Sequence, residues 1–207
     1  MKLSDEQRDA IAELINIAFS RTAASLADLT GRRIVIDVPK VDICPSSELT
    51  DKLKDFVEGD LTTVHQVFSG PVSGTAMLML NTQGASMLVD LLTDGHSIGA
   101  QRLDTTSREV LTEVGNILLN ACLGMFGNLL KIQVSFSVPD LHLEHLDSMM
   151  RTITIGEKGL EYALLLFTTF RLKDSAIEGC LVIVLSVASL ERFLEGVKAW
   201  AAGAGEE

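Results

Sequence analysis

The sequence predicts an α+β fold in which a unit of helix, strand, short helix, two strands and helix occurs twice. Two observations predict it. Hydrophobic periodicity alternates between helical and strand spacing in the same order in both halves. In addition, three residues recur at a displacement of 100, which indicates a duplicated unit. They are Glu13, Asn16 and Pro39 in the first half and Glu113, Asn116 and Pro139 in the second.

The first half is expected to begin with a long helix from Ser4 to about Thr30. Ser4-x-x-Gln7 forms a capping box at its start, and Gly31 is a suitable C-terminal stop. Apolar residues at helical spacing mark its buried face. These residues, with the one threonine among them, are Ile11, Leu14, Ile15, Ala18, Thr22, Leu26 and Leu29.

The same order of elements is expected to follow in each half. Thr106-x-x-Glu109 forms a second capping box at the start of the second long helix. We expect a single domain over residues 1–207, with repeats of about 4–94 and 104–201. In the first half we expect a strand at 33–39, a short polar helix or turn at 46–56, strands at 62–69 and 74–80, a helix at 82–92 and a linker at 93–99. In the second half we expect a helix at 106–130, a strand at 131–138, a polar segment at 141–151, a turn at 156–159, strands at 161–172 and 178–187, and a helix at 189–201.

Composition excludes several classes of protein. The chain has 207 residues, of which 47% are hydrophobic and 22% charged, so it can bury a core. Its 17 basic and 28 acidic residues give a net charge of -11, spread evenly over both halves, and no basic cluster that would bind nucleic acid. No signal peptide is visible, and the apolar stretch at 180–187 is too short to span a membrane. Three widely spaced cysteines without a CxxC pattern indicate buried, reduced thiols in a cytoplasmic protein.

Polar residues gather in one narrow stripe on each long helix, opposite the apolar face. At about 100° per residue, each stripe is roughly 60° wide. A solvated surface would explain one such stripe. Asparagine is a mediocre helix former, however, and its recurrence three residues after a glutamate favours a selected site. The stripes are Asp9, Glu13, Asn16 and Ser20 on the first helix and Glu109, Glu113, Asn116 and Asn120 on the second.

The paired carboxylate and carboxamide suggest a type of chemistry. A carboxamide donates and accepts hydrogen bonds without titrating, so it suits the orientation of a water molecule. A carboxylate suits binding a partner's Lys or Arg. Because neither is a nucleophile beside a base, the pattern favours side chains that are inserted into the active site of another protein. The water-positioning Gln in GTP hydrolysis is used in this way. Metal binding by the carboxylates is a minor alternative, since no histidine shares either stripe.

Histidines elsewhere offer a second candidate metal site. His142 and His145 lie close together in Leu-His-Leu-Glu-His, but no further ligands are near them in the sequence. A polar edge segment is therefore the favoured interpretation. His65 and His96 are isolated in the sequence.

The repeated pattern resembles the double signature of the CheC/CheX/FliY family of chemotaxis phosphatases. In that family the signature is Asp/Ser-x3-Glu-x2-Asn-x22-Pro. Here it reads Asp9-x3-Glu13-x2-Asn16-x22-Pro39 and Glu109-x3-Glu113-x2-Asn116-x22-Pro139. The stretch 113–124, EVGNILLNACLG, is similar to the CheC type. The resemblance extends over nearly the whole chain and implies two similar halves that share a mainly antiparallel sheet, with both long helices exposed.

The resemblance also implies a function, which is removal of the phosphoryl group from the aspartyl phosphate of a phosphorylated CheY-like response regulator. Transferred to this sequence, Asn16 and Asn116 would orient the attacking water, and Glu13 and Glu113 would dock to the active-site Lys of the regulator. The chain would need no cofactor of its own, because the magnesium ion would belong to the regulator. CheC-type proteins commonly partner with the deamidase CheD, which makes a CheD-like protein a second candidate partner.

The pattern departs from the family in two places. Glu109 stands where the signature has Asp or Ser, and its capping box is one explanation. Phe19 and Arg21 are bulky neighbours of Asn16 and are expected to hinder the first site, so the two sites need not be equal. The alternative function is a non-catalytic binding module that uses the same helix faces to sequester a regulator or a CheD-like partner.

Overall fold

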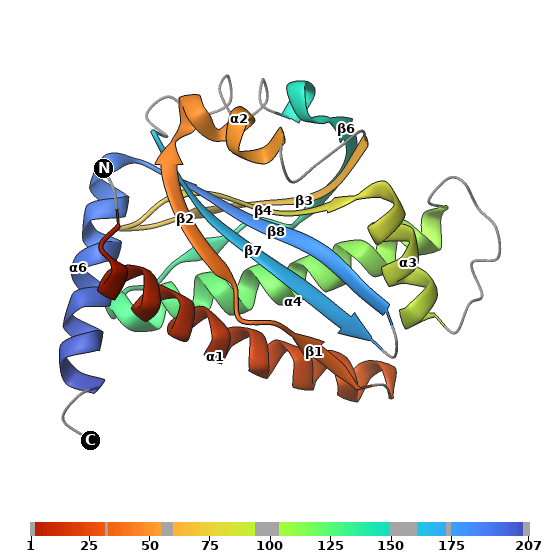
Figure 1. Ribbon diagram of the computed structural model, residues 1–207, viewed down its shortest axis with the longest axis horizontal. Helices are drawn as coiled ribbons and strands as arrows, with labels where there is room; N and C mark the ends of the chain where they lie inside the picture. The colour runs from red at the N-terminus through yellow and green to blue at the C-terminus, as the bar shows by residue number, and fades with distance from the viewer. Residues whose placement is uncertain are drawn as a thin grey trace.

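A computed structural model shows one curved sheet covered by helices on both faces (Figure 1). It describes residues 3–31, 33–54, 60–93, 104–149, 161–172 and 175–204. The helices are α1 (Asp5–Thr30), η1 (Ser46–Glu48), α2 (Leu49–Lys54), α3 (Thr82–Leu92), α4 (Thr105–Leu130) and α6 (Val187–Ala204). The strands are β1 (Ile34–Ile36), β2 (Lys40–Pro45), β3 (Asp60–Ser69), β4 (Gly74–Asn81), β5 (Ser135–Phe136), β6 (Asp140–His145), β7 (Tyr162–Leu172) and β8 (Ser175–Leu185). The expected turn at 156–159 and the linker residues 94–99 lie outside the described residues.

The two halves of the chain exchange strands within this sheet. Its order is β1-β7-β8-β4-β3-β5, with β2 also beside β7 and β6 beside β3, and every pair is antiparallel. The first strands of each half therefore pair with the hairpin of the other half. The register repeats as well, since Lys40 lies opposite Phe167 and Asp140 opposite His65. The α+β class and the shared antiparallel sheet are confirmed.

The two repeated prolines do not end their strands as expected but separate two strands. Pro39 lies between β1 and β2, and Pro139 lies between β5 and β6. Proline has no N–H to donate to a ladder, so the chain places it in the break. The expected polar segment at 141–151 is wrong over residues 141–145, which belong to β6. Its polar side chains fit a strand because β6 is an edge strand, beyond β3, and its outer side is open to water.

The caps of α1 agree with the sequence, whereas the start of α4 does not. Ser4 and Gln7 form the expected capping box, and Gly31 closes α1 with a φ of 66°. At α4 the cap is Asp104, whose carboxylate accepts a hydrogen bond from the Ser107 N–H at 2.8 Å. Hydrogen bonding by the side chain of Ser107, together with this backbone bond, lowers the pKa of Asp104. The capping box expected at Thr106 is therefore wrong, and it cannot explain Glu109.

Hydrophobic side chains cover both faces of the sheet, so it forms the middle of three layers. The larger cluster lies on the side of α1, α4 and α6, and the smaller one joins the other face to α2. The described residues expected on the buried face of α1 are all buried. Fixed packing on one side leaves the opposite sides of α1 and α4 free to face solvent.

The three cysteines are free and buried, as expected for structural thiols. Burial raises the pKa of Cys44 to about 11. It also raises the pKa of Cys122 and of Cys180. At neutral pH all three are therefore protonated and unreactive.

Candidate functional site on the two long helices

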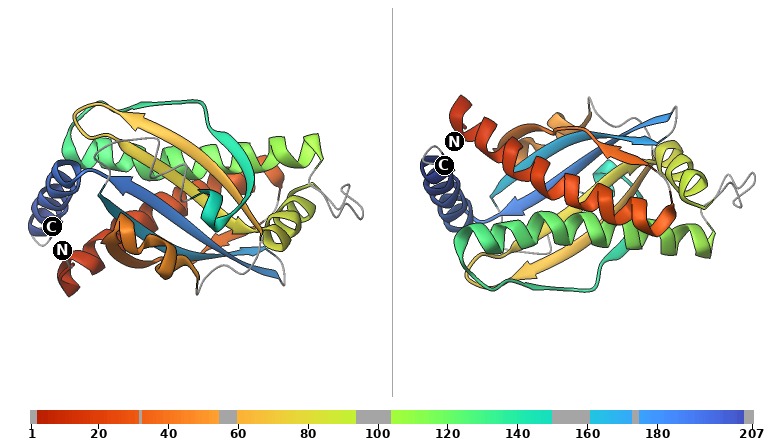
Figure 2. Two further views of the ribbon diagram at one scale, coloured as in Figure 1. Left: turned by 90° about the horizontal axis from the view of Figure 1, so that it is seen from above. Right: turned by 90° about the horizontal axis from the view of Figure 1, so that it is seen from below.

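Helices α1 and α4 lie side by side on one face of the sheet and run in opposite directions (Figure 2). This arrangement follows from the duplication, because each helix begins its own half of the chain. The two signatures therefore lie on one continuous two-helix surface. A partner could approach either helix from the same side of the molecule.

The Glu/Asn pairs are accessible on both helices. The side chains of Glu13 and Glu113 are exposed, and those of Asn16 and Asn116 are partly buried. Partial burial restrains a carboxamide while leaving one side of it open. Among the described residues, none of the best-formed hollows is lined by these four side chains. The arrangement therefore suits insertion into a partner better than reception of a small substrate.

Two expectations about the surroundings of these pairs are wrong. Phe19 is fully buried, so its bulk lies in the core and cannot obstruct the surface at Asn16. The small residues Ala23 and Gly115, which the helical spacing would place beside the polar stripes, are both buried. Arg21 is exposed, as the sequence indicates.

Asn116 is held by a chain of hydrogen bonds that reaches into the sheet. The Nδ2 of Asn120 donates to the Oδ1 of Asn116 at 2.6 Å. The Nε2 of Gln66, on β3, donates to the Oδ1 of Asn120 at 3.1 Å and to the backbone carbonyl of Ser137 at 3.0 Å. Gln66 is only 2% exposed, so this chain begins in the protein interior and ends at the surface.

A glycine allows α4 to approach β3 closely beside this chain. A Cβ on Gly115 would lie 2.6 Å from Cγ1 of Val64, too close for any side chain to fit without movement. Val64 and Gln66 share one face of β3 and are about 7 Å apart along the strand. Gly115 and Asn120 are separated by a similar distance, about 7.5 Å, along the helix axis. Close contact at Gly115 therefore brings Asn120 within reach of Gln66.

The corresponding positions of the first half make a shorter connection. The strand registers relate Gln66 to Thr168, and Thr168 donates to the backbone carbonyl of Asp37 at 2.7 Å. Ser20 stands in the place of Asn120. In the part of the chain that the structure describes, no hydrogen bond joins Ser20 to Asn16. The two sites therefore share the Glu/Asn pair but differ in what supports the Asn.

Sequence reasoning placed Asn120 in the polar stripe but did not identify Gln66. One signal was available. Gln66 alternates with Val64 and Phe68 on one face of an expected strand, where an apolar residue would be usual. The link to Asn120 could not be read from the sequence, because 54 residues separate the two side chains.

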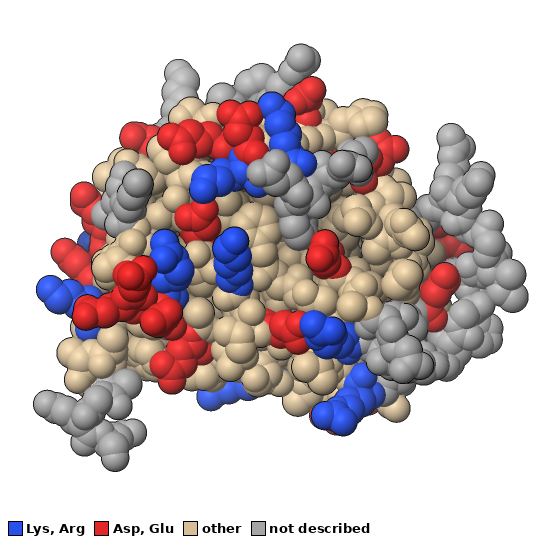
Figure 3. All heavy atoms as spheres, in the orientation of Figure 1, with Lys and Arg blue, Asp and Glu red and all other residues tan. Residues whose placement is uncertain are grey.

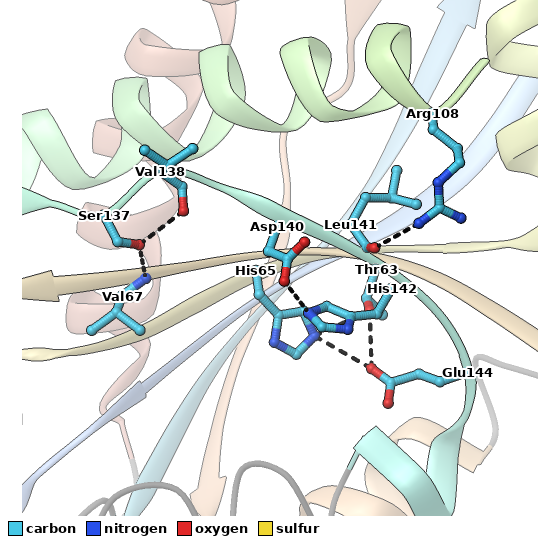
Figure 4. A network of polar contacts seen from close by, with 10 residues as sticks. All are labelled: Thr63, His65, Val67, Arg108, Ser137, Val138, Asp140, Leu141, His142 and Glu144. Atoms are coloured by element: carbon cyan, nitrogen blue, oxygen red, sulfur yellow. Dashed lines mark hydrogen bonds and ion pairs between the residues drawn. The ribbon is translucent and has the colours of Figure 1, made fainter. Parts of the chain in front are cut away.

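The histidines form a polar network on β3 and β6 (Figure 4). The rings of His65 and His142 have centroids 4.7 Å apart, so His65 is not isolated. The Nε2 of His65 lies 3.1 Å from the hydroxyl of Thr63 and 3.5 Å from a carboxylate oxygen of Glu144. Burial and His142 lower the pKa of His65 to about 4, against an opposing effect of Asp140.

This network does not resemble a metal centre. Within the described ranges, no group of three or more His, Cys, Asp or Glu side chains could hold a metal ion. His145 pairs instead with Asp60, at 2.9 Å. His96 lies outside the described residues.

Charges are mixed over the surface. On the face drawn in Figure 3, basic side chains lie among acidic ones. Lys52 pairs with Asp42 at 2.6 Å, and Arg171 pairs with Asp37 at 2.7 Å. Neutralised basic groups of this kind offer little to a polyanion.

Helix α4 is long and apolar enough to cross a membrane by length and composition alone. A core helix passes the same test. Leu118 and Leu119 are fully buried, and α4 packs against the sheet, which explains its apolar character.

Comparisons with known proteins identify relatives of this chain, although no family model matches it. It is 26% identical to the CheY-P phosphatase CheC of Bacillus subtilis over 168 residues, covering 76% of this chain and 78% of CheC. It is 24% identical to the flagellar motor switch phosphatase FliY of Bacillus subtilis over 142 residues, or 68% of this chain. The chain matches only 36% of the length of FliY.

A solved structure agrees with these relatives. Thermotoga maritima FliY has the same fold, with a TM-score of 0.76 at 20% identity over 96% of this chain and 99% of that one. In sequence and in fold, the chain is similar to members of the CheC/CheX/FliY family. The resemblance indicated by the repeated signature is thereby confirmed.

The fold of the CheC/CheX/FliY family also occurs elsewhere. FliM in a FliG-FliM complex from H. pylori matches with a TM-score of 0.65 at 11% identity, covering 93% of this chain and 100% of that one. Such a likeness concerns the fold alone, because one fold can carry different functions. The function of this chain therefore has to be argued from its site.

Proposed function

We propose that this protein hydrolyses the aspartyl phosphate of a phosphorylated CheY-like response regulator. The observation that carries the proposal is the pair of accessible Glu/Asn sites on α1 and α4, repeated at the same spacing. The names of the relatives CheC and FliY, both called phosphatases, support the same reaction.

Each residue type suits one step of this reaction. The carboxylates of Glu13 and Glu113 dock by pairing with a lysine in the acceptor site of the regulator. The carboxamides of Asn16 and Asn116 orient a water molecule for in-line attack on phosphorus. The acyl phosphate bond breaks, phosphate leaves, and the aspartate of the regulator is restored.

The regulator supplies the rest of the chemistry in this proposal. Its bound magnesium ion neutralises charge on the phosphoryl oxygens, so this chain needs no metal or cofactor of its own. Phosphoryl transfer depends mainly on positioning and electrostatics, which explains why the site contains neither a nucleophile nor a general base. We place this activity in the cytoplasm, with a CheD-like protein as a further candidate partner.

A binding module is the second candidate function. It is favoured by the accessibility of both Glu/Asn pairs, since a partner could cover these helix faces without any reaction. In that case the same helix faces would sequester a regulator without hydrolysis.

Phosphate release from a phosphorylated CheY-like regulator distinguishes the two functions. A phosphatase accelerates release at substoichiometric amounts, and Asn16→Ala/Asn116→Ala removes the acceleration. Asn128→Ala is a matched control, because Asn128 is exposed near the end of α4, three turns from Asn116. A sequestering module would slow release in proportion to the complex formed, and this result would refute the catalytic proposal.

A further inference from the structure

The hydrogen bonds behind Asn116 have a fixed direction. The backbone carbonyl of Ser137 can only accept, so it requires the amide nitrogen of Gln66 on its side. The other hydrogen on that nitrogen points to Asn120, which must present its oxygen there and its nitrogen toward Asn116. The Oδ1 of Asn116 is thereby turned toward Asn120, and its Nδ2 faces away.

The burial of Gln66 makes this direction costly to reverse. Both of its amide hydrogens are used, while its Oε1 is buried and has no hydrogen-bond partner among the described residues. A reversed Gln66 would place that oxygen against the carbonyl oxygen of Ser137 and leave acceptors facing each other. A buried polar group without a partner is unfavourable, so its retention at this position calls for an explanation.

Resting on the proposed function, we infer that Gln66 and Asn120 are positioning residues that hold the Asn116 carboxamide in one orientation for water activation. One lone pair of its Oδ1 and both Nδ2 hydrogens remain available to the attacking water and the phosphoryl group. Among the residues that the structure describes, the first site has no such support, because the hydroxyl of Thr168 ends its connection at the backbone carbonyl of Asp37. Asn16 must therefore be ordered by the regulator itself.

The test isolates the second site by using the Asn16→Ala protein as parent. In this parent, Gln66→Met removes the hydrogen bonds of Gln66 and keeps a side chain of similar volume. Asn120→Ser removes the hydrogen bond to Asn116 and introduces the residue that the first half has at the corresponding position, Ser20. We expect kcat for dephosphorylation of the regulator to fall about tenfold in each, and KM to stay within twofold. A fall in kcat without a change in KM reports positioning once kcat is divided by the concentration of folded protein, because unfolded protein lowers the apparent kcat and leaves KM unchanged.

Matched controls separate the possible outcomes. Thr168→Val removes the equivalent buried polar group of the first half and should leave kcat within twofold. Thermal unfolding measures the folded fraction of each variant, and Asn120→Ser, at a partly buried position, carries the test if Gln66→Met does not fold. If Gln66→Met and Asn120→Ser both keep the kcat of the parent while Asn116→Ala abolishes it, the positioning inference is wrong and the proposed function stands. If Asn116→Ala retains the parent rate, the proposed function itself fails at this site.

Discussion

Asn120 donates a 2.6 Å hydrogen bond to Asn116 across one turn of α4, and no such bond joins Ser20 to Asn16 among the described residues. The two signatures are alike in sequence, so this difference arises from what lies behind each helix. Gly115 and Gln66 support the second site. In the first half, the fully buried Ile15 stands in the place of Gly115, and Thr168 stands in the place of Gln66. Unequal support predicts unequal activity.

The first prediction concerns that inequality. Asn116→Ala should lower kcat for regulator dephosphorylation about tenfold, because it removes the preorganised carboxamide. Asn16→Ala should lower it by no more than about a tenth, because two independent sites that add to the wild-type rate leave at most about a tenth of it to the first site. Single-turnover phosphate release with each variant checks this. Equal losses would show that the hydrogen bonds to Asn120 and Gln66 have no effect on the reaction.

The second prediction concerns docking. Glu113→Gln in the Asn16→Ala parent should raise KM for the regulator about tenfold, the value of one charge-assisted hydrogen bond of about 1.4 kcal/mol. The difference in KM between Glu113→Gln and its parent should become smaller at high salt, where the ion pair contributes less. Glu109→Gln is the control, since Glu109 is also exposed but lies one turn earlier. An unchanged KM for Glu113→Gln would exclude the docking role.

The third prediction concerns the approach of α4 to the sheet. Gly115→Ala should lower the free energy of unfolding by about 1–3 kcal/mol, because its Cβ would lie 2.6 Å from Val64. Gly124→Ala, with no atom within 4 Å of its Cβ, should raise that free energy by about 0.5–1 kcal/mol through helix propensity. Urea denaturation of both variants measures the difference. Stabilisation by both alanines would contradict the close contact.

The fourth prediction concerns His65. Its pKa is lowered to about 4 in the folded protein, so on acidification the unfolded chain takes up a proton that the folded one refuses. The stability it contributes is therefore complete above about pH 6.5 and is lost as pH falls toward 4. We expect about 2 kcal/mol of this loss to disappear in His65→Gln. Parallel stability curves for wild type and His65→Gln between pH 7 and 4.5 would contradict it.

The features that the sequence predicted well are those set by local patterns. The extent of α1, its capping box at Ser4 and its stop at Gly31 follow from neighbouring residues, and the Glu/Asn signature shows itself by repetition. Asp104 was missed as the cap of α4 because Thr106-x-x-Glu109 offers a competing local pattern two residues later. Long-range packing decides such competition.

The features that the sequence could not predict depend on tertiary register. Strand β6 is recognisable only through its pairing with β3, which completes an edge that its polar side chains do not suggest. The connection from Gln66 to Asn116 needs the position of α4 on the sheet, which Gly115 and Val64 determine. Both are contacts between the halves of a strand-exchanged fold.

The most direct test of the account is the rate of phosphate release from a phosphorylated CheY-like regulator with catalytic amounts of protein. The wild-type protein should accelerate release over the spontaneous rate of the regulator, and Asn16→Ala/Asn116→Ala should return it to that rate while still binding the regulator. If the double variant accelerates release as well as the wild type does, the two asparagines do not carry the reaction, and the central claim is wrong.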